Sequence, residues 1–449
     1  MKFTIHTYGC QMNVRDSEAV AALMRAAGHE QAAPGENPDV AIVNSCTVRG
    51  RAENKAIGKT GNFLAEKRAG RVKAVGLMGC AVSRLGADVF KILPGLDFAA
   101  GPRRFGAIPV LAERALAGGR ELLELPDPDE IPGCMDAHSP GGFRAFVTVL
   151  LGCDNRCSYC IVPDVRGHEY SRPAREVAAE VASLAANGVK EVTLLGQSVL
   201  RYGRRNPAFG PQDPPSAMGF SEPFPRLLEM LQGVDGLERI RFTSGHPSGC
   251  TPELARAFRE LPKACRHLHL PVQSGSDRVL REMGRGYTRA ESLSAVARLR
   301  GTDPEFAVTT DIIVGYPGET EADFEDTRTL MEEAGFDNAF VFKYSPRAGT
   351  RSAALPDDVP AAEKERRDQV LLADQDRRGL ERNSRLAGTV REVMAEGPSA
   401  RNAARWSGRD SGNRIVVFEP GAAPPAPGST VRVKIDRAAP QTLYGTLAP

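Results

Sequence analysis

Nine cysteines are the residues of this sequence best suited to chemistry, and three of them stand close together. Cys153, Cys157 and Cys160 lie at positions i, i+4 and i+7, directly after an apolar stretch. Three thiolates in one short loop can surround a cubane iron–sulfur cluster and leave its fourth iron without a protein ligand. An open metal position allows such a site to bind and activate a ligand. We therefore interpret this loop as a catalytic iron–sulfur site.

Zinc is the main alternative for these three cysteines, because zinc also binds thiolates. A structural zinc site needs a fourth ligand, and the nearest further cysteine, Cys134, lies 19 residues upstream across a proline-rich segment. None of the seven histidines has zinc-finger spacing from a cysteine pair. The spacings favour iron–sulfur chemistry over zinc. Cys134, Cys250 and Cys265 fit no motif, and we interpret them as ordinary thiols.

Three further cysteines, Cys10, Cys46 and Cys80, each follow a short apolar stretch within the first hundred residues. A helical pattern follows each cysteine, and this alternation predicts a parallel α/β sheet. Ligands of such sheets bind beyond the carboxyl ends of the strands, so we expect the three cysteines to share one ligand there. Three buried structural cysteines are the alternative, since cysteine is among the most buried residue types.

The middle of the chain continues the α/β pattern. The expected strands cover residues 143–151, 191–196, 239–244, 267–272, 307–314 and 339–344. Helical patterns lie between them, as at 175–186 and 321–334. Six β/α units predict an open or partial barrel, because a closed (β/α)8 barrel requires eight. The proline-rich stretch 206–224 is expected to be a surface loop or lid.

The last part of the chain is expected to be a small basic β domain. A charged helix at 360–385 precedes strand candidates at 389–395, 414–418 and 430–435, which predict a small antiparallel barrel. From Arg382 to the end there are ten Lys and Arg against five Asp and Glu, a net charge of +5, whereas the whole chain carries +2. This concentration favours a nucleic-acid partner, and an ordinary solvated surface is the alternative. Arg405, Trp406 and Arg409 are the best stacking candidates, although Trp406 could equally be barrel core.

Length and composition limit the remaining possibilities. A chain of 449 residues predicts two to four domains, and 25% charged with 41% apolar residues excludes global disorder. No apolar run approaches the roughly 18 residues of a membrane span. The polar N-terminus is not expected to be a signal peptide. We expect a cytoplasmic protein with a first domain at 1–117, a linker rich in Asp, Glu and Pro at 118–138, a barrel at 139–380 and a basic domain at 381–447.

The Cys-x3-Cys-x2-Cys spacing, with Tyr159 before the last cysteine, resembles the radical S-adenosylmethionine superfamily. The resemblance implies that the amine and carboxylate of the cofactor chelate the open iron, and that reductive cleavage yields a 5'-deoxyadenosyl radical. It also implies that Tyr159 lies near the adenine of the cofactor. The ends of the second, fourth and fifth barrel strands supply the other expected cofactor-binding residues, which are Gly196, Gln197, Gln273, Ser274 and Asp311.

The segments around Cys10, Cys46 and Cys80 closely resemble three motifs of the methylthiotransferase family, whose thiolates bind an auxiliary 4Fe–4S cluster. The basic C-terminal segment resembles the RNA-binding TRAM domain, so the resemblance covers nearly the whole chain. It implies two 4Fe–4S clusters and S-adenosylmethionine as cofactors. The implied fold is a Rossmann-like parallel α/β domain, a partial (β/α)6 radical S-adenosylmethionine barrel and a small antiparallel β-barrel.

The segments at 193–197, 267–276, 309–311 and 344–347 are most similar to one branch of this family. That branch adds a methylthio group to C2 of N6-dimethylallyladenosine next to the anticodon of tRNA. Branches that modify threonylcarbamoyl-adenosine of tRNA or an aspartate of a ribosomal protein are alternatives, and a zinc-dependent RNA-binding protein without turnover is an alternative of another class. The chain departs from the family at 163–167, which reads Pro-Asp-Val-Arg-Gly where Pro-Tyr-Thr-Arg-Gly is common.

The resemblance also implies a division of labour between the clusters. One cofactor molecule donates a methyl group to sulfur on the auxiliary cluster, and a second is cleaved at the Cys153, Cys157 and Cys160 cluster so that its radical removes the hydrogen at C2. The expected partners are the tRNA anticodon loop and an electron donor such as flavodoxin or ferredoxin, and we expect a monomer. The pattern does not identify the sulfur donor.

Overall fold

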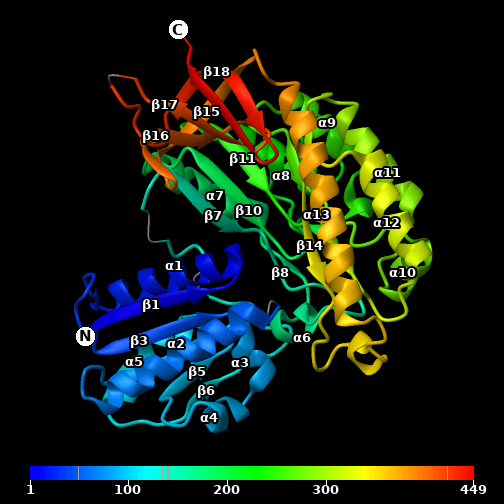
Figure 1. Cartoon of the computed structure of the whole chain (residues 1–449). Helices are drawn as coiled ribbons and strands as arrows, with labels where there is room; N and C mark the ends of the chain where they lie inside the picture. The colour runs from blue at the N-terminus through cyan, green and yellow to red at the C-terminus, as the bar shows by residue number, and fades with distance from the viewer. Residues whose placement is uncertain (49, 134, 139–140, 422, 449) are drawn as a thin grey trace.

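The computed structural model describes residues 1–48, 50–133, 135–138, 141–421 and 423–448 (Figure 1). Cys134 lies outside these described residues. The chain forms an N-terminal α/β domain, a central partial barrel and a C-terminal β-barrel. Within the described ranges, no helix combines the length and the apolar character that crossing a membrane requires.

The N-terminal domain is a six-stranded sheet whose pairings are all parallel. Its strand order is β2-β1-β3-β4-β5-β6. Helices α1 and α5 cover one face, and α2, α3 and α4 cover the other. The strands are β1 (Lys2–Tyr8), β2 (Glu30–Gln31), β3 (Val40–Ser45), β4 (Ala74–Gly79), β5 (Phe98–Ala100) and β6 (Leu122–Glu124). The helices are α1 (Gln11–Ala26), α2 (Gly50–Arg68), α3 (Cys80–Leu85), α4 (Asp88–Ile92) and α5 (Ile108–Leu116).

Strand β6 lies inside the segment that the composition indicated as a linker, 118–138, so this expectation was wrong for its first part. Leu122 pairs with Phe98 of β5. Leu122 packs on the α1 and α5 side of the sheet, whereas Leu123 packs on the α2 side. Burial of two consecutive leucines on opposite faces favours a strand here over the loop that the flanking Pro, Asp and Glu residues predicted.

The central domain has six parallel strands, as the sequence predicted, arranged as β7-β10-β11 and β12-β13-β14. A single bridge between Ile240 and Ala264 connects the two halves. These strands are β7 (Arg144–Thr148), β10 (Glu191–Leu195), β11 (Arg239–Phe242), β12 (His267–His269), β13 (Ala307–Val314) and β14 (Asn338–Lys343). The first expected strand is split, because β8 (Leu150–Leu151) pairs with β9 (Tyr170–Ser171).

Helices cover the outer face of this partial barrel and bury one continuous apolar core. They are α7 (Ala174–Ala186), α8 (Pro223–Gln232), α9 (Pro252–Glu260), α11 (Arg289–Arg300), α12 (Glu321–Ala334) and α13 (Ala361–Ser384). Two shorter helices, α6 (Val162–Arg166) and α10 (Asp277–Glu282), lie in the loops at the carboxyl ends of the strands.

The C-terminal domain is a closed five-stranded barrel in the order β15-β16-β17-β19-β18. Four of its pairings are antiparallel, and β17 with β19 is parallel. The strands are β15 (Val390–Ser399), β16 (Asn402–Arg409), β17 (Ile415–Glu419), β18 (Thr430–Ala439) and β19 (Thr442–Leu447). Trp406 is half-buried and packs against the barrel core, which favours its structural role over stacking on RNA.

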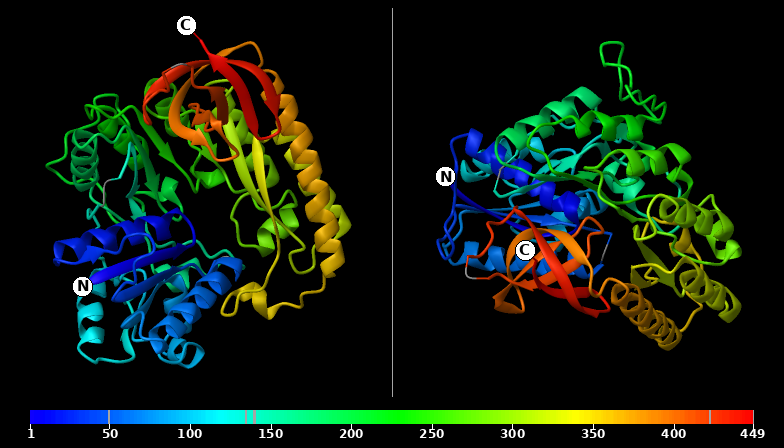
Figure 2. Two further views of the ribbon diagram at one scale, coloured as in Figure 1. Left: turned by 60° about the vertical axis from the view of Figure 1, so that its left-hand side comes forward. Right: turned by 90° about the horizontal axis from the view of Figure 1, so that it is seen from above.

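The C-terminal barrel docks on the amino ends of the central strands. Arg239 and Arg241 of β11 donate to the carbonyl oxygens of Arg409 (2.7 Å) and Asp410 (2.8 Å), and Arg414 pairs with Asp337 at 3.0 Å. The N-terminal domain lies at the opposite end of the central domain, next to α6 (Figures 1 and 2). The carboxyl ends of the central strands therefore face the N-terminal domain.

Candidate active site

Cys10, Cys46 and Cys80 follow three neighbouring strands, β1, β3 and β4, as the sequence predicted. Tyr8, Ser45 and Gly79 form one row across these strands, so each cysteine leaves the sheet within two residues of the same line. Cys10 is exposed, whereas Cys46 and Cys80 are each only 2% exposed. The sheet therefore brings the three thiols to one edge of the domain.

Two buried asparagines connect the loops that carry these cysteines. The Asn13 side chain accepts from the Cys10 backbone N–H (3.2 Å) and donates to Asn44 Oδ1 (3.0 Å) and to the Ser45 carbonyl (3.2 Å). Asn44 donates in return to the Asn13 carbonyl at 2.8 Å. The Ser45 hydroxyl donates to the carbonyl of Met78, which precedes Gly79 and Cys80 (2.8 Å). Because Asn13, Asn44 and Ser45 are completely buried, the network fixes the three loops relative to one another.

Gly79 is required by both backbone conformation and space. Its φ of +100° is disfavoured for any residue with a Cβ atom. A Cβ atom here would lie 2.5 Å from both Asn44 Oδ1 and the Ser45 carbonyl oxygen. The glycine thus permits the close approach between the loop of Cys80 and the asparagine network.

The second set of cysteines, Cys153, Cys157 and Cys160, lies in the loop after β8 and directly before α6. Ser158 anchors this loop, because its N–H donates to the Met283 carbonyl (2.8 Å) and its carbonyl accepts from the Ser352 N–H (2.9 Å). The Ser158 hydroxyl lies 2.8 Å from the Tyr316 hydroxyl. Tyr159 packs in an apolar cluster formed by Val279, Met283, Ile313, Tyr316 and Tyr344.

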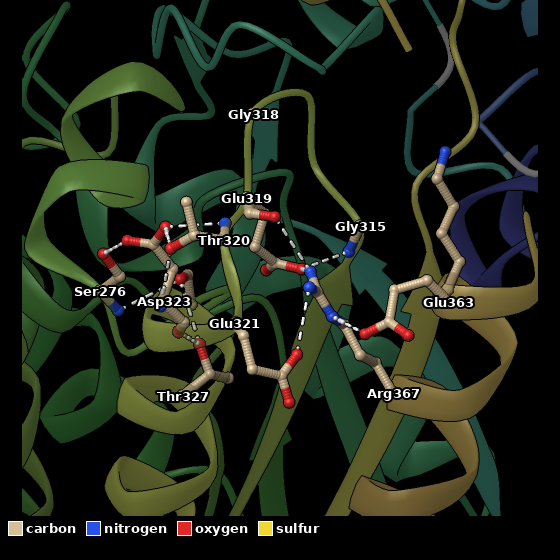
Figure 3. Close-up of polar contacts among 12 residues, drawn as sticks. Ser276, Gly315, Gly318, Glu319, Thr320, Glu321, Asp323, Thr327, Glu363 and Arg367 are labelled. Carbon is tan, nitrogen blue, oxygen red and sulfur yellow. Dashed lines mark hydrogen bonds and ion pairs between the residues drawn. The ribbon is translucent and has the colours of Figure 1, made fainter. Parts of the chain in front are cut away.

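Helix α13 supports the same loop through the turn after β13, and Figure 3 shows the contacts of Glu319 in this turn with Gly315 and Arg367. Glu319 Oε2 accepts from the Gly315 N–H (2.6 Å) and from Arg367 Nη1 of α13 (2.7 Å). Burial raises the pKa of Glu319, and the hydrogen bonds from Gly315 and Arg367 oppose this shift. The turn fixed in this way carries Tyr316, the partner of Ser158. The charged helix after the barrel therefore helps to position the cysteine loop.

The two cysteine sets are neighbours. Arg166, the last residue of α6, donates from Nε to Cys80 Sγ (3.2 Å) and from Nη2 to Asp16 Oδ2 of α1 (3.0 Å). Ile161 and Val165 pack directly against Cys80 in one apolar cluster. Ile161 directly follows Cys160, and Val165 belongs to α6. Cys80 of the first cysteine set therefore packs against α6, which begins just after the second set.

Both sites offer donors that suit an iron–sulfur cluster. Burial raises the pKa values of Cys80 and Cys153 to about 11 and that of Cys160 to about 12, so these thiols become thiolates only beside compensating positive charge. Arginines provide part of that charge, Arg166 at Cys80 and Arg285 at Cys157, where Nη1 lies 3.2 Å from Sγ. Iron provides the rest when a cluster is bound, because each thiolate ligates a different iron. Among the described residues, no group of three His, Cys, Asp or Glu side chains is arranged to hold a single metal ion.

Of the expected cofactor-binding residues, Gly196 and Gln197 directly follow β10, and Gln273 and Ser274 lie in the loop after β12. Asp311 lies within β13, not at its carboxyl end. Gly196 follows β10, and beside it Gln197 Oε1 is buried without a hydrogen-bond partner among the described residues, so it can accept from a bound amine. Gln273 has a left-handed φ of +71° and bridges to Ile312 of β13. Asp311 Oδ2 lies 3.3 Å from His269 Nε2. Ser274 is fully buried, and its hydroxyl lies 3.2 Å from that of Thr327 in α12.

Two arginines at the cysteine sites escaped prediction as site residues. Arg166 stood out in the sequence only as part of the unusual segment 163–167. Arg285 donates to Cys157 Sγ and to the Pro271 carbonyl (2.9 Å), and it lies between Gly284 and Gly286, which both have a φ of +69°. The Gly-Arg-Gly run signals a special turn, but nothing in it indicates which side chain the arginine contacts.

Comparison with known families agrees with this architecture. Residues 2–101 match the uncharacterized protein family UPF0004, residues 147–331 match the radical SAM superfamily, and residues 384–448 match the TRAM domain. The radical SAM superfamily implies a 4Fe–4S cluster and S-adenosylmethionine. Among solved structures, the fold is similar to TsrM of Kitasatospora setae, a radical S-adenosylmethionine methyltransferase. Its TM-score is 0.58 at 14% identity, covering 88% of this chain and 81% of that chain.

Curated relatives match along their whole length. The tRNA-2-methylthio-N(6)-dimethylallyladenosine synthase of Opitutus terrae is 41% identical, over 99% of this chain and 96% of its own. The protein of the same name from Geobacter metallireducens is 43% identical, over 99% of this chain and 98% of its own. The chain therefore belongs to the tRNA-2-methylthio-N(6)-dimethylallyladenosine synthase family of radical S-adenosylmethionine enzymes.

Proposed function

We propose that this chain adds a methylthio group to C2 of N6-dimethylallyladenosine in tRNA, next to the anticodon. The names of its full-length relatives support this reaction. The observation that carries the proposal is the packing of Cys80 against Ile161, which directly follows Cys160, and against Val165 of α6. Methylthiolation needs hydrogen removal and sulfur delivery at the same carbon, so the two reactive sites must be neighbours.

Each cysteine set would hold one 4Fe–4S cluster, Cys153, Cys157 and Cys160 the catalytic one, and Cys10, Cys46 and Cys80 the auxiliary one. When bound, these clusters and S-adenosylmethionine supply radical hydrogen abstraction and methylated sulfur. The donor chemistry supports both sites, since each offers three thiols with an arginine on one of them. The auxiliary cluster is the part of this proposal that rests on the cysteine geometry alone.

The protein residues around the clusters would position the reactants. Tyr159, Gly196, Gln197, Gln273, Ser274 and Asp311 are the proposed cofactor contacts. Gln197 Oε1 has the strongest support, because a ligand N–H would satisfy this buried atom. Ser274 would act through its backbone, since its hydroxyl faces Thr327.

The proposed macromolecular partner is the anticodon loop of tRNA. A target base in a single-stranded loop can be unstacked and turned into a protein site at low cost. The net charge of +5 from Arg382 onward supports phosphate contacts by the TRAM barrel, with affinity that falls as salt rises. An electron donor such as flavodoxin or ferredoxin, a monomeric state and the domain limits 139–380 and 381–447 complete the proposal.

Nucleoside mass spectrometry tests the proposed function. Anaerobically reconstituted protein would be incubated with S-adenosylmethionine, dithionite and tRNA that carries N6-dimethylallyladenosine. We expect 2-methylthio-N6-dimethylallyladenosine in the digested tRNA. An unmodified N6-dimethylallyladenosine in this digest would contradict the proposal, as would a product formed only in parallel incubations with tRNA carrying threonylcarbamoyl-adenosine or with ribosomal protein.

A further inference from the structure

The inner face of the central barrel differs from its outer face. Val308, Ile312 and Val314 of β13 point outward and are completely buried under the helices. The alternate residues Thr309 and Asp311 point inward and are half-exposed. The inner face is therefore open to solvent at the level of Asp311, as a binding surface must be.

Near the amino ends of the barrel strands, side chains fill the space at this inner face. Glu191 of β10 and Arg241 of β11 form a buried ion pair at 2.7 Å, and Arg241 also donates to the Asp410 carbonyl of the C-terminal barrel. His267, one layer further along, is buried as well. The open part of the inner face thus lies between these buried residues and the cysteine loop. Tyr159 of that loop and Ile313 of β13 pack against the same apolar cluster.

Phe340 stands in the open part, and its exposure is unusual. It is 49% exposed, and it is the only exposed aromatic side chain in the described part of the chain. Phe340 lies opposite Asp311 in the register of β13 and β14. Its ring stands edge-on to the imidazole of His269, with the ring centroids 5.9 Å apart. An aromatic ring left in water inside a barrel marks a surface that an apolar ligand group would cover.

Contacts between polar side chains beside Phe340 hold His269 in place between Thr309 and Asp311. His269 Nδ1 lies 2.9 Å from Thr309 Oγ1, and His269 Nε2 lies 3.3 Å from Asp311 Oδ2. The imidazole is therefore held from both sides and can orient the Asp311 carboxylate. A carboxylate next to an exposed aromatic ring suits a ligand with an apolar group adjoining an N–H group, which describes an N6-alkylated adenine.

We propose that Phe340 is the specificity-determining contact for the dimethylallyl group of the substrate base, with His269 as a positioning residue beneath the base. The inference rests on the proposed function and deepens it. The cofactor would lie on the Tyr159 and Ile313 side of Asp311, and the base would lie on the Phe340 side. The alkyl group would cover the ring of Phe340, and the remaining N6–H would face Asp311.

The test compares two synthetic anticodon stem–loop RNAs that differ only in the dimethylallyl group of the target adenosine. For Phe340→Ala, we expect the preference in kcat/KM for the alkylated RNA to fall about tenfold or more, mainly through KM, because several buried carbons lose their partner. Phe340→Leu, which keeps an apolar surface, should retain most of the preference. Leu372→Ala, at a site 37% exposed on α13, is the matched control and should behave as the unchanged protein.

The remaining outcomes separate the possible failures. An unchanged preference in Phe340→Ala would overturn the inference. Equal losses of iron content and of RNA-independent cofactor cleavage in both Phe340 variants would also overturn it, because they would indicate a structural role. If the unchanged protein cleaves the cofactor but methylthiolates neither RNA, the proposed function itself fails, and the inference fails with it.

Discussion

Arg166 Nε lies 3.2 Å from the Sγ atom of Cys80, across 86 residues of sequence. The same guanidinium pairs with Asp16 in α1. Arg166 ends the helix that starts just after Cys160, so one side chain joins the loop of the second cysteine set to two elements of the N-terminal domain. The relative placement of the two proposed clusters depends on this buried contact.

Replacing Arg166 by methionine should destabilise the protein by about 3–5 kcal/mol, because it leaves Asp16 buried without its partner. The double variant Arg166→Met with Asp16→Asn should lose less stability than Arg166→Met alone, since no unpaired carboxylate remains buried. Urea unfolding of the cluster-free proteins measures the stability change in the single variant and in the double variant. A double variant less stable than Arg166→Met would show that the ion pair does not account for the effect.

Gly79→Ala should disturb the first cysteine site more than Gly86→Ala does. Both glycines have positive φ values, +100° and +55°, so both substitutions carry a backbone cost of about 1–3 kcal/mol. Only at Gly79 would the added Cβ crowd Asn44 and Ser45, whereas nothing lies within 4 Å at Gly86. We expect the free energy of unfolding, measured in urea, to fall about 1–3 kcal/mol further in Gly79→Ala than in Gly86→Ala. Equal losses would contradict the role of the asparagine network.

Arg285→Leu should lower the reduction potential of the cluster at Cys157. Reduction adds negative charge, which the Arg285 guanidinium stabilises from 3.2 Å. We expect a shift of about 60 mV or more to lower potential, a factor of ten for a one-electron couple. Redox titration followed by electron paramagnetic resonance measures it, with Arg281→Leu, an exposed neighbour, as the control. A shift in the control as large as in Arg285→Leu would refute the specific contact.

Asp323→Asn should cost about 2 kcal/mol of stability at neutral pH. Burial alone would raise the pKa of Asp323, but hydrogen bonds from Arg278, Ser276 and Thr320 outweigh it and lower the pKa. Figure 3 shows the contacts with Ser276 and Thr320. The folded pKa is therefore below the unfolded value of about 3.9, so this stabilisation is present above about pH 4 and is lost as pH falls below it.

The stability difference between Asp323→Asn and the unchanged protein should therefore shrink below about pH 4. Denaturant unfolding at several pH values measures it, and Asp326→Asn, exposed on the same helix, is the control. A difference that stayed constant from pH 7 to pH 3 would exclude an ionised Asp323 as its source.

The strand ends that carry the cysteines could be predicted from the sequence. A short apolar run locates each buried strand, and the alternation of strands with helices indicates a parallel sheet. A buried strand is an apolar run, and the carboxyl ends of parallel strands share one edge, so Cys10, Cys46 and Cys80 were expected together. Strand β6 was missed because the residues around Leu122 and Leu123 have loop composition. Strands β16 and β19 were missed because their half-exposed residues mix Gly, Ser and Thr with few apolar side chains.

The arginine contacts at sulfur could not be predicted in the same way. Arg166 and Arg285 reach cysteines 86 and 128 residues away. Such contacts depend on how α6 and the turn around Gly284 pack in three dimensions, which no local pattern encodes. The open inner face around Phe340 is also a property of the assembled barrel, because alternation in β14 alone does not show that no helix covers one side.

Iron analysis of the reconstituted protein tests the central claim, two separate clusters at neighbouring cysteine sets, most directly. We expect about eight irons per chain in the unchanged protein and about four after joint replacement of Cys10, Cys46 and Cys80 by alanine. That variant should still cleave the cofactor to 5'-deoxyadenosine with dithionite and should form no methylthio product. About four irons in the unchanged protein, or an iron content that the three substitutions leave at its original value, would contradict the account.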